Sequence, residues 1–363
     1  MAFNAAECFS HDYQEARAKF RAAVEEADGH LESVTHPERG PDGGELATDI
    51  AWFGPRDAEK VLVTLSGTHG VEGFCGSGAQ LHWLRRAEHR RLPAGTAAML
   101  VHAVNPYGFA WLRRVTEDNV DLNRNWIDFS KALPANPGYD QLHDIFCPAE
   151  WGDAVQAHTA AELLRFAAEK GPAALQAAMS GGQYNHPDGV FFGGAGPTWS
   201  RRTQTEIYRQ HLSKAAKVGI IDFHTGLGPW GFGEQIVVVK PNTPEFTRAR
   251  SWYGAAITSP SGGTSTSSDI TGDGLSAAAQ ILPGVQVTGM ALEVGTQSLS
   301  DVTLALRADA WLHGHGDPTG PEAAPIKRQI RDAFYGDADE WKGMVAGQGM
   351  LVCRQAVAAL NAD

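Results

Sequence analysis

Short, continuous runs of apolar residues restrict the fold of this sequence more than any other feature. Each run is rich in valine, isoleucine or leucine and ends at a glycine, a proline or a polar turn. A strand with one face in water alternates apolar and polar residues, whereas a strand covered on both faces is apolar throughout. The sequence therefore predicts a buried sheet, with strands at residues 60–67, 97–106, 217–226, 234–240 and 289–296.

Longer stretches with helical character lie between and around these predicted strands. Strands that alternate with helices indicate an α/β fold, in which helices flank both faces of a mixed, mostly parallel twisted sheet. No linker divides the 363 residues, so we expect a single domain over residues 1–363. Around its sheet we expect a helical N-terminal segment (about 1–30), an insertion (about 127–216) and a helical C-terminal tail (about 318–363) that breaks near Gly336.

The composition argues against several classes of function. A formal net charge of −12 does not favour nucleic acid or an anionic membrane as the main partner. No apolar run approaches the length of about 18 residues that would span a membrane, and no secretion signal is expected. The four cysteines are scattered and form no CxxC pair, which is typical of reduced thiols. We therefore expect a cytoplasmic enzyme, and the sequence does not indicate its oligomeric state.

Chemically active side chains stand at the ends of three predicted strands. His69 and Glu72 follow the strand at 60–67 in a glycine-rich stretch. His224 ends the third predicted strand, and Glu293 lies in the last one. In an open α/β sheet, ligands bind beyond the carboxyl ends of the strands. Two histidines and two acids should therefore meet at one edge of the sheet.

This set of side chains has the composition of a catalytic zinc site. Two imidazoles and one carboxylate suit Zn²⁺ and leave a fourth position for water, whose pKa the metal lowers to about 7. A second carboxylate that does not bind the metal can then transfer protons, and Glu293 is available for this role. Asp222 lies two residues before His224, on the same face of the strand. It either orients a ligand histidine or caps a neighbouring helix.

Four motifs in this order resemble those of the M14 zinc carboxypeptidases, from about residue 60 to 300. They are GTHGVEG (67–73), NPYGFAWLRRVTEDNVDLNRNW (105–126), DFHTG (222–226) and LEVGT (292–296). The stretch GGQYNHPDGVFFGG (181–194) is similar to the DUF2817 branch of M14-like proteins. The resemblance implies a zinc carboxypeptidase-like fold with a mixed sheet of roughly eight strands.

The same resemblance implies roles for individual residues. His69, Glu72 and His224 would bind one zinc ion, and Glu293 would act as general base and then as general acid. Asn123 and Arg124 match the pair that holds the terminal carboxylate of the substrate, a task that suits a planar guanidinium and an amide.

Two further roles follow from the resemblance. Arg114 matches the arginine that stabilises the oxyanion, although the adjacent Arg113 leaves this assignment open by one residue. Tyr253 is the only tyrosine between His224 and Glu293, so it is the candidate for a substrate-binding tyrosine on a mobile loop.

Together these features predict a zinc-dependent hydrolase of an amide bond next to a free carboxylate, in a peptide or another small molecule. An aspartoacylase-like deacylase of N-acyl amino acids on the same site is the alternative within the enzymes. An inactive module that only binds carboxylates is the alternative outside them. The side-chain specificity cannot be read from the sequence.

Other residues of interest receive less specific predictions. The Gly/Ser/Thr-rich segment 258–276 is either a mobile surface loop or a lid, and the segment 181–194 either caps the cleft or connects elements. His186 has no acidic residue at ligand spacing, so no second metal site is predicted. Cys75 is expected to pack at a helix start, since a thiol nucleophile would need its own base.

Overall fold

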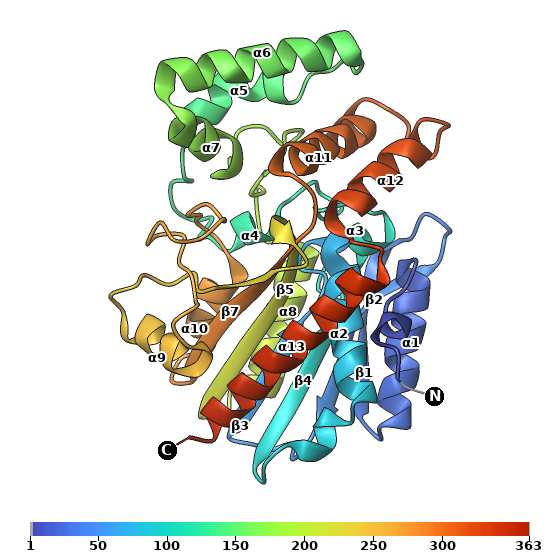
Figure 1. The fold of residues 1–363 in the computed structure, drawn as a ribbon, viewed down its shortest axis with the longest axis vertical. Helices are drawn as coiled ribbons and strands as arrows, with labels where there is room; N and C mark the ends of the chain where they lie inside the picture. The colour runs from blue at the N-terminus through green and yellow to red at the C-terminus, as the bar shows by residue number, and fades with distance from the viewer. Residues whose placement is uncertain (1–2, 363) are drawn as a thin grey trace.

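The computed structural model describes residues 3–362 and is built around one mixed sheet (Figure 1). Within those residues the sheet has seven strands in the order β1-β2-β4-β3-β5-β7-β6, rather than the roughly eight expected. The central strands β4, β3, β5 and β7 are parallel, and β1, β2 and β6 are antiparallel to their neighbours. The strands are β1 (His30–Arg39), β2 (Glu45–Phe53), β3 (Lys60–Leu65), β4 (Thr96–His102), β5 (Lys217–Trp230), β6 (Gly233–Ile236) and β7 (Gln286–Gly295).

The five strands predicted from apolar runs are all present as β3 to β7, but the sequence prediction misses β1 and β2. β1 lies at an edge of the sheet and most of its side chains are exposed, so it contains no apolar run. β2 is buried, yet it carries the carboxylate of Asp49 into the interior. Arg17 donates to that carboxylate at 2.8 Å and Ser33 donates at 2.5 Å. Such pairing allows a buried charge, which interrupts the expected pattern.

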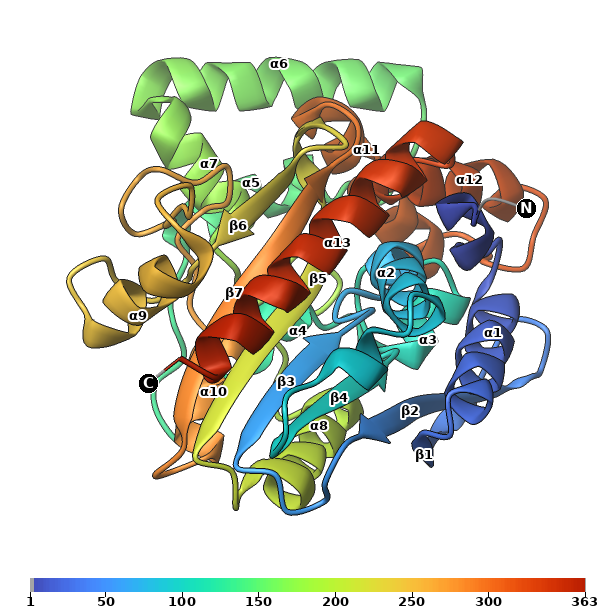
Figure 2. The same cartoon turned by 60° about the horizontal axis from the view of Figure 1, so that its bottom comes forward.

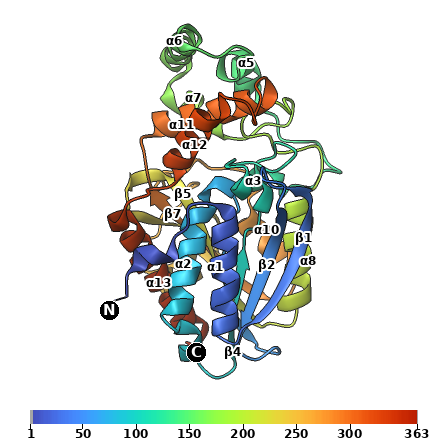
Figure 3. The same ribbon diagram turned by 90° about the vertical axis from the view of Figure 1, so that its right-hand side faces the viewer.

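Helices cover both faces of the sheet, as the apolar strands predict (Figures 2 and 3). On β5, Ile221 and Phe223 belong to the core cluster shared with α1, α2 and α13. Val218 and Ile220 belong to a second cluster shared with α8 and α10. Successive side chains of a strand point to opposite faces, so each face of β5 is buried against helices. These helices are α1 (Tyr13–Glu26), α2 (Gly73–Arg85), α8 (Trp199–Leu212), α10 (Gly274–Ile281) and α13 (Asp339–Leu360).

A second group of helices lies above the carboxyl ends of the central strands (Figure 1). We call α5 (Pro137–Phe146), α6 (Asp153–Lys170) and α7 (Pro172–Ser180) the cap. α11 (Leu299–Gly314) and α12 (Ala323–Phe334) lie between the cap and the sheet. The segment expected as an insertion therefore supplies the cap and also α8.

The remaining elements are short or peripheral. The tail is helical as predicted, and α12 and α13 are separated by residues 335–338, around Gly336. The short helices are α3 (Pro106–Ala110), α4 (Leu122–Asn125) and α9 (Pro244–Tyr253). None of the helices in residues 3–362 combines the length and the apolar character needed to cross a membrane.

Two backbone segments touch directly where the chain leaves β3. Gly70 opens the one-turn helix η2 (Gly70–Glu72), and a Cβ atom at this position would lie 2.0 Å from the carbonyl carbon of Gly108 in α3. No side chain fits in such a contact. Glycine at residue 70 therefore lets the turn that carries His69 and Glu72 pack against α3.

We predict that Gly70→Ala destabilises the protein by about 3 kcal/mol or more, because backbone atoms must move to accept the methyl group. Gly347→Ala is the matched control. Gly347 lies on the exposed side of α13, and a Cβ there would meet nothing within 4 Å. This control should gain about 0.5–1 kcal/mol from helix propensity. Chemical denaturation measures both changes, and equal stability of the two variants would contradict the close-contact interpretation.

Candidate metal centre and substrate pocket

The predicted metal ligands come from elements that end at one edge of the sheet. His69 and Glu72 lie between β3 and α2, where the chain turns over the end of the sheet. His224 lies in β5 and faces Glu293 of β7 directly across the parallel pair. Because β3, β5 and β7 run in the same direction, their carboxyl ends bring these four residues together.

The side chains of His69, Glu72 and His224 converge in the interior. The Nδ1 atom of His69 lies 2.9 Å from Oε1 of Glu72, and the Nδ1 atom of His224 lies 2.9 Å from Oε2. The two Nδ1 atoms are 3.2 Å apart. All three side chains are buried, and each offers one ligand atom within 4.8 Å of the others. The geometry thus matches a group that could share one metal ion.

The opposite ring nitrogens of both histidines contact carboxylates. Nε2 of His69 lies 3.1 Å from Asp121, and Nε2 of His224 lies 2.9 Å from Asp222. When Nε2–H donates to a carboxylate, the Nδ1 lone pair faces inward. Two lone pairs and the carboxylate of Glu72 then point at the same volume, where a cation would offset their mutual repulsion. This donor set fits Zn²⁺ with one open position.

Asp222 therefore contacts His224. This position agrees with the first of its two predicted roles, the orientation of a ligand histidine. Asp222 also accepts a hydrogen bond from the Thr68 hydroxyl at 2.8 Å. Asp121 plays the corresponding part at His69 and was missed from the sequence. The only available signal was its place in the DLNRNW motif, which gives no hint of a histidine 52 residues away.

The pKa values of Glu72 and Glu293 are shifted in opposite directions by their surroundings. Burial raises the pKa of Glu72, but the neighbouring His69 and the hydrogen bond with His224 outweigh it and hold this pKa well below its usual range. Burial, followed by repulsion from Glu72, raises the pKa of Glu293 to about 7. Its Oε1 accepts a hydrogen bond from the Leu227 amide at 3.1 Å. Glu293 can therefore gain or lose a proton near neutral pH.

The structure places Arg114, and not Arg113, beside the metal centre. Arg114 lines the pocket and donates to Glu72 at 2.8 Å and to Asp121 at 3.0 Å. Arg113 is buried elsewhere, where it donates to Asp309 at 2.9 Å. Of the two adjacent arginines, Arg114 therefore remains the candidate for stabilising an oxyanion.

Asn123 and Arg124 also line the pocket. Arg124 is 4% exposed and donates to the Ser180 carbonyl at 2.6 Å. Asp121 lies 3.8 Å from its guanidinium, beyond hydrogen-bond distance, and the buried Nε has no partner. Burial lowers the pKa of this guanidinium. Arg124 therefore presents a positive charge that a carboxylate in the pocket would satisfy.

The prediction for Tyr253 is wrong. Tyr253 ends α9, is 3% exposed and belongs to the core cluster that also contains Cys353 of α13. It does not line the pocket. Helix α9 packs against α13 and β7, so its last side chain points into the core and cannot reach a substrate.

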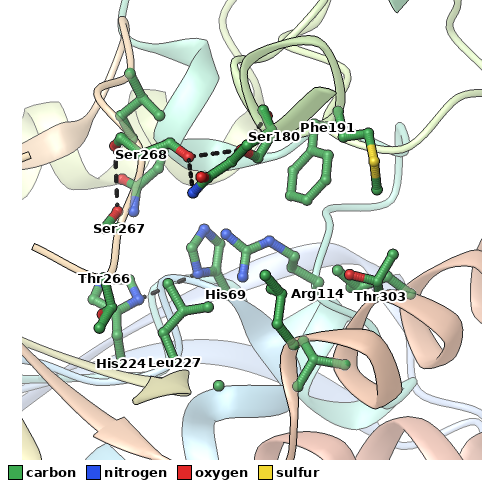
Figure 4. A pocket seen from close by; sticks show the side chains of 18 of the residues that line it. His69, Arg114, Ser180, Phe191, His224, Leu227, Thr266, Ser267, Ser268 and Thr303 are labelled. Carbon is green, nitrogen blue, oxygen red and sulfur yellow. Dashed lines mark hydrogen bonds between the residues drawn. The ribbon is translucent and has the colours of Figure 1, made fainter. Parts of the chain in front are cut away.

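The centre opens into a cavity of about 740 Å³ (Figure 4). The segment 258–276 covers part of it, and Ser268 lies 2.8 Å from Ser180 at the end of α7. Phe191, from the segment 181–194, lies over the guanidinium groups of Arg114 and Arg124, at 5.7 and 5.5 Å. Both segments whose roles were left open therefore contribute to the wall or roof of this pocket.

Two other predictions concern His186 and Cys75, which do not line this pocket. The statement that His186 has no acidic partner is wrong: Asp140, 46 residues earlier, lies 2.9 Å from its Nε2, and Asp188 follows only two residues later. With His143 and Asp188, His186 forms a second group of possible metal ligands, none of which lines the large pocket. Cys75 is fully buried, and burial raises the pKa of its thiol well above the usual range, which agrees with a packing role.

Solved structures with a similar fold include metallocarboxypeptidases. Carboxypeptidase A from Helicoverpa armigera has 13% sequence identity and a TM-score of 0.51, with 96% of this chain and 74% of that chain covered. Bovine thrombin-activatable fibrinolysis inhibitor, solved in complex with tick carboxypeptidase inhibitor, has 11% identity, covers 97% and 99%, and has a TM-score of 0.47. A metallo-carboxypeptidase from Pseudomonas aeruginosa has 14% identity, covers 93% and 69%, and has a TM-score of 0.42.

At such low identity a likeness concerns the fold alone, and the one to carboxypeptidase A from Helicoverpa armigera agrees with the predicted carboxypeptidase-like sheet. A search of curated proteins finds no match. The profile of a family described as "Protein of unknown function (DUF2817)" matches residues 9–348, which is most of the chain. The protein therefore belongs to the DUF2817 family.

Proposed function

We propose that this protein is a zinc-dependent hydrolase that cleaves an amide bond next to a free carboxylate. One observation carries the proposal: the imidazoles of His69 and His224, which converge on buried Glu72, line the same pocket as the Arg124 guanidinium and the carboxylate of Glu293, whose pKa is raised. Each part serves a different requirement of amide hydrolysis. The similar fold of a carboxypeptidase A is consistent with this proposal.

Substrate binding is assigned to Asn123 and Arg124. The Arg124 guanidinium would take the free carboxylate of the substrate, which would add a close partner to a buried positive charge whose ion pair with Asp121 is long, at 3.8 Å, and whose Nε has no partner. The amide of Asn123 would add a directional contact. Anchoring the substrate at this end places the scissile carbonyl over the metal centre and lowers the entropic part of the barrier.

The chemistry is assigned to His69, Glu72 and His224 as ligands, with Glu293 and Arg114 beside them. A bound zinc ion would polarise the scissile carbonyl and acidify a water at the open position. Glu293 would accept the proton of the attacking water and donate it to the leaving nitrogen, a cycle that suits a pKa near neutrality. Arg114 would donate to the oxygen that becomes negatively charged.

A deacylase of N-acyl amino acids is the second candidate, and the roof of the pocket favours it. The contact between Ser268 and Ser180 closes the space above the centre. Gln176 of α7 also donates to the Ser268 hydroxyl, at 3.2 Å. A roof held by three side chains leaves less room for a long peptide than for a compact substrate.

The proposal is tested with a panel of C-terminal peptides and N-acyl amino acids, assayed with and without a chelator. We expect hydrolysis that the chelator abolishes and zinc restores. His69→Ala should lose this activity and about one metal equivalent per chain relative to the parent protein, measured by elemental analysis. If no substrate is hydrolysed by the zinc-loaded protein, a module that only binds carboxylates becomes the better description.

We predict that Glu293→Gln lowers kcat roughly 10²- to 10⁴-fold and leaves the metal content unchanged, because the amide keeps the shape but cannot take a proton. Glu234 provides the matched control. It is the buried glutamate opposite Glu293 on β6, and its carboxylate binds Thr258 and Thr266 instead of lining the pocket. Glu234→Gln should retain kcat within severalfold, and similar losses in both variants would remove the proton-transfer assignment.

We predict that Arg124→Ala lowers kcat/KM for substrates with a free carboxylate roughly 10- to 100-fold, as expected for the loss of charged hydrogen bonds. Substrates whose carboxylate is converted to an amide should already be poor and should lose little more. The ratio of the two kcat/KM values is therefore the measurement. An equal loss on both substrate types would contradict a carboxylate clamp at this residue.

A further inference from the structure

We propose that the part of the pocket beneath the cap is an acyl-chain site, and that the preferred substrates are N-acyl amino acids with a medium or long saturated acyl group. The inference rests on the proposed function, since it assigns the acyl side of the same amide substrate. The inference also extends the proposed function, because it assigns the binding of the acyl group to the cap.

The cap and α11 enclose an apolar chamber that continues from the metal centre. Leu163 of α6 and Met179 of α7 line it from above. Val302 and Leu306 of α11 line it from the side, and Phe334 closes it at the end of α12. These side chains pack in one hydrophobic cluster. The wall is therefore apolar where it leaves the zinc ligands.

The size of the cavity exceeds what a small acyl group requires. The whole pocket, which includes the candidate metal ligands and Arg124 as well as the chamber, has a volume of about 740 Å³, within the range of pockets that bury drug-sized ligands. An acetyl or succinyl group would leave most of the chamber filled with water against apolar walls. A flexible alkyl chain would displace that water, and its burial supplies binding free energy in proportion to the apolar area removed.

The polar groups of the chamber are mostly paired with one another. The Arg307 guanidinium donates to the Gln156 side-chain oxygen at 2.7 Å and to the Thr159 hydroxyl at 3.0 Å. At the roof, the hydroxyls of Ser268 and Ser180 contact each other. With Nε donating to the Phe146 carbonyl, every nitrogen of this guanidinium has a neutral partner within the protein, and Arg307 is a buried positive charge among the apolar side chains of the wall.

Because the polar groups of the chamber wall mostly bind one another, few are left to bind the backbone of a peptide, and an alkyl chain is favoured. Each peptide residue brings one N–H and one C=O group, and burying either without a partner is costly. The buried amide nitrogen of Gln156 has no partner, but one donor does not match the alternating groups of an extended peptide. An alkyl chain needs no partner at all.

The test measures kcat/KM for N-acetyl-, N-octanoyl- and N-dodecanoyl-leucine. Each buried methylene corresponds to about a fourfold change in affinity, so octanoyl should exceed acetyl by roughly 100-fold or more. Leu163→Asn, which places an amide in the chamber wall, should lower the octanoyl-to-acetyl ratio roughly 10-fold. Leu163→Phe, which fills the chamber, should shift the preference to shorter chains even if the asparagine variant folds poorly.

Leu164 gives a matched control on the same helix. It is adjacent to Leu163 but 71% exposed and does not line the pocket. Leu164→Asn should therefore leave the octanoyl-to-acetyl ratio at the parent value. Equal effects of the two asparagine variants would overturn the proposal, because they would reflect the stability of α6 and not the chamber.

Binding measured by calorimetry separates this proposal from the hydrolase proposal. N-octanoyl-leucine should bind Glu293→Gln protein more tightly than N-acetyl-leucine, and Leu163→Asn should remove the difference. If this chain-length dependence of binding is found but the zinc-loaded parent protein hydrolyses no substrate, the acyl-chain site is supported and the hydrolase proposal is rejected. If the parent protein hydrolyses the substrates at rates that do not depend on chain length, the hydrolase proposal is supported and the acyl-chain site is rejected. A tri-leucine peptide hydrolysed as well as N-octanoyl-leucine would overturn the assignment to an acyl chain.

Discussion

The pairing of buried charges at the carboxyl edge of the sheet is the constraint on which this structure depends. A buried carboxylate without partners costs several kcal/mol, so the segments that carry charge must close on one another. Asp121 illustrates this demand, because it contacts His69, Arg114 and, at longer distance, Arg124. The turn after β3 and the segment from α3 to α4 therefore satisfy each other, and the candidate metal centre forms as a consequence of the same closure.

Within this cluster, the two glutamates face a conflict that a divalent cation would relieve. Glu72 is held ionised by His69 and His224, and its charge helps to raise the pKa of Glu293. Protonation of Glu293 is one way to reduce the repulsion. A cation bound between Glu72 and the histidines would reduce it as well and would keep Glu293 available as a base. The arrangement would thus link metal binding to the protonation state that the proposed hydrolysis requires.

The sequence was most informative where a side chain follows directly from a strand end. His69, His224 and Glu293 could be placed together because β3, β5 and β7 are recognisable apolar runs with one direction. Tyr253 could not be placed, because its side-chain direction depends on how α9 packs against α13.

Contacts between distant segments were equally invisible. Asp121 and the acidic partner of His186 meet their histidines across 52 and 46 residues, and no local pattern encodes such pairs. β1 was not predicted because most of its side chains are exposed at the sheet edge, so it contains no apolar run. β2 was not predicted because the buried, paired Asp49 interrupts its apolar pattern. The sequence suggested that the insertion could cap the cleft, but it did not show which of its helices would do so.

The cap owes its position to a second buried charge. Arg307 of α11 is 6% exposed and donates to the Phe146 carbonyl of α5 and to Gln156 and Thr159 of α6. These bonds join two cap helices to α11, which follows β7 and therefore Glu293 along the chain. Because each acceptor would be left buried and unpaired if the cap moved away, the network resists opening. The chamber wall and the Glu293 carboxylate are thus held in one frame, so the side chains to which we assign acyl-chain binding keep a fixed position relative to the group to which we assign proton transfer.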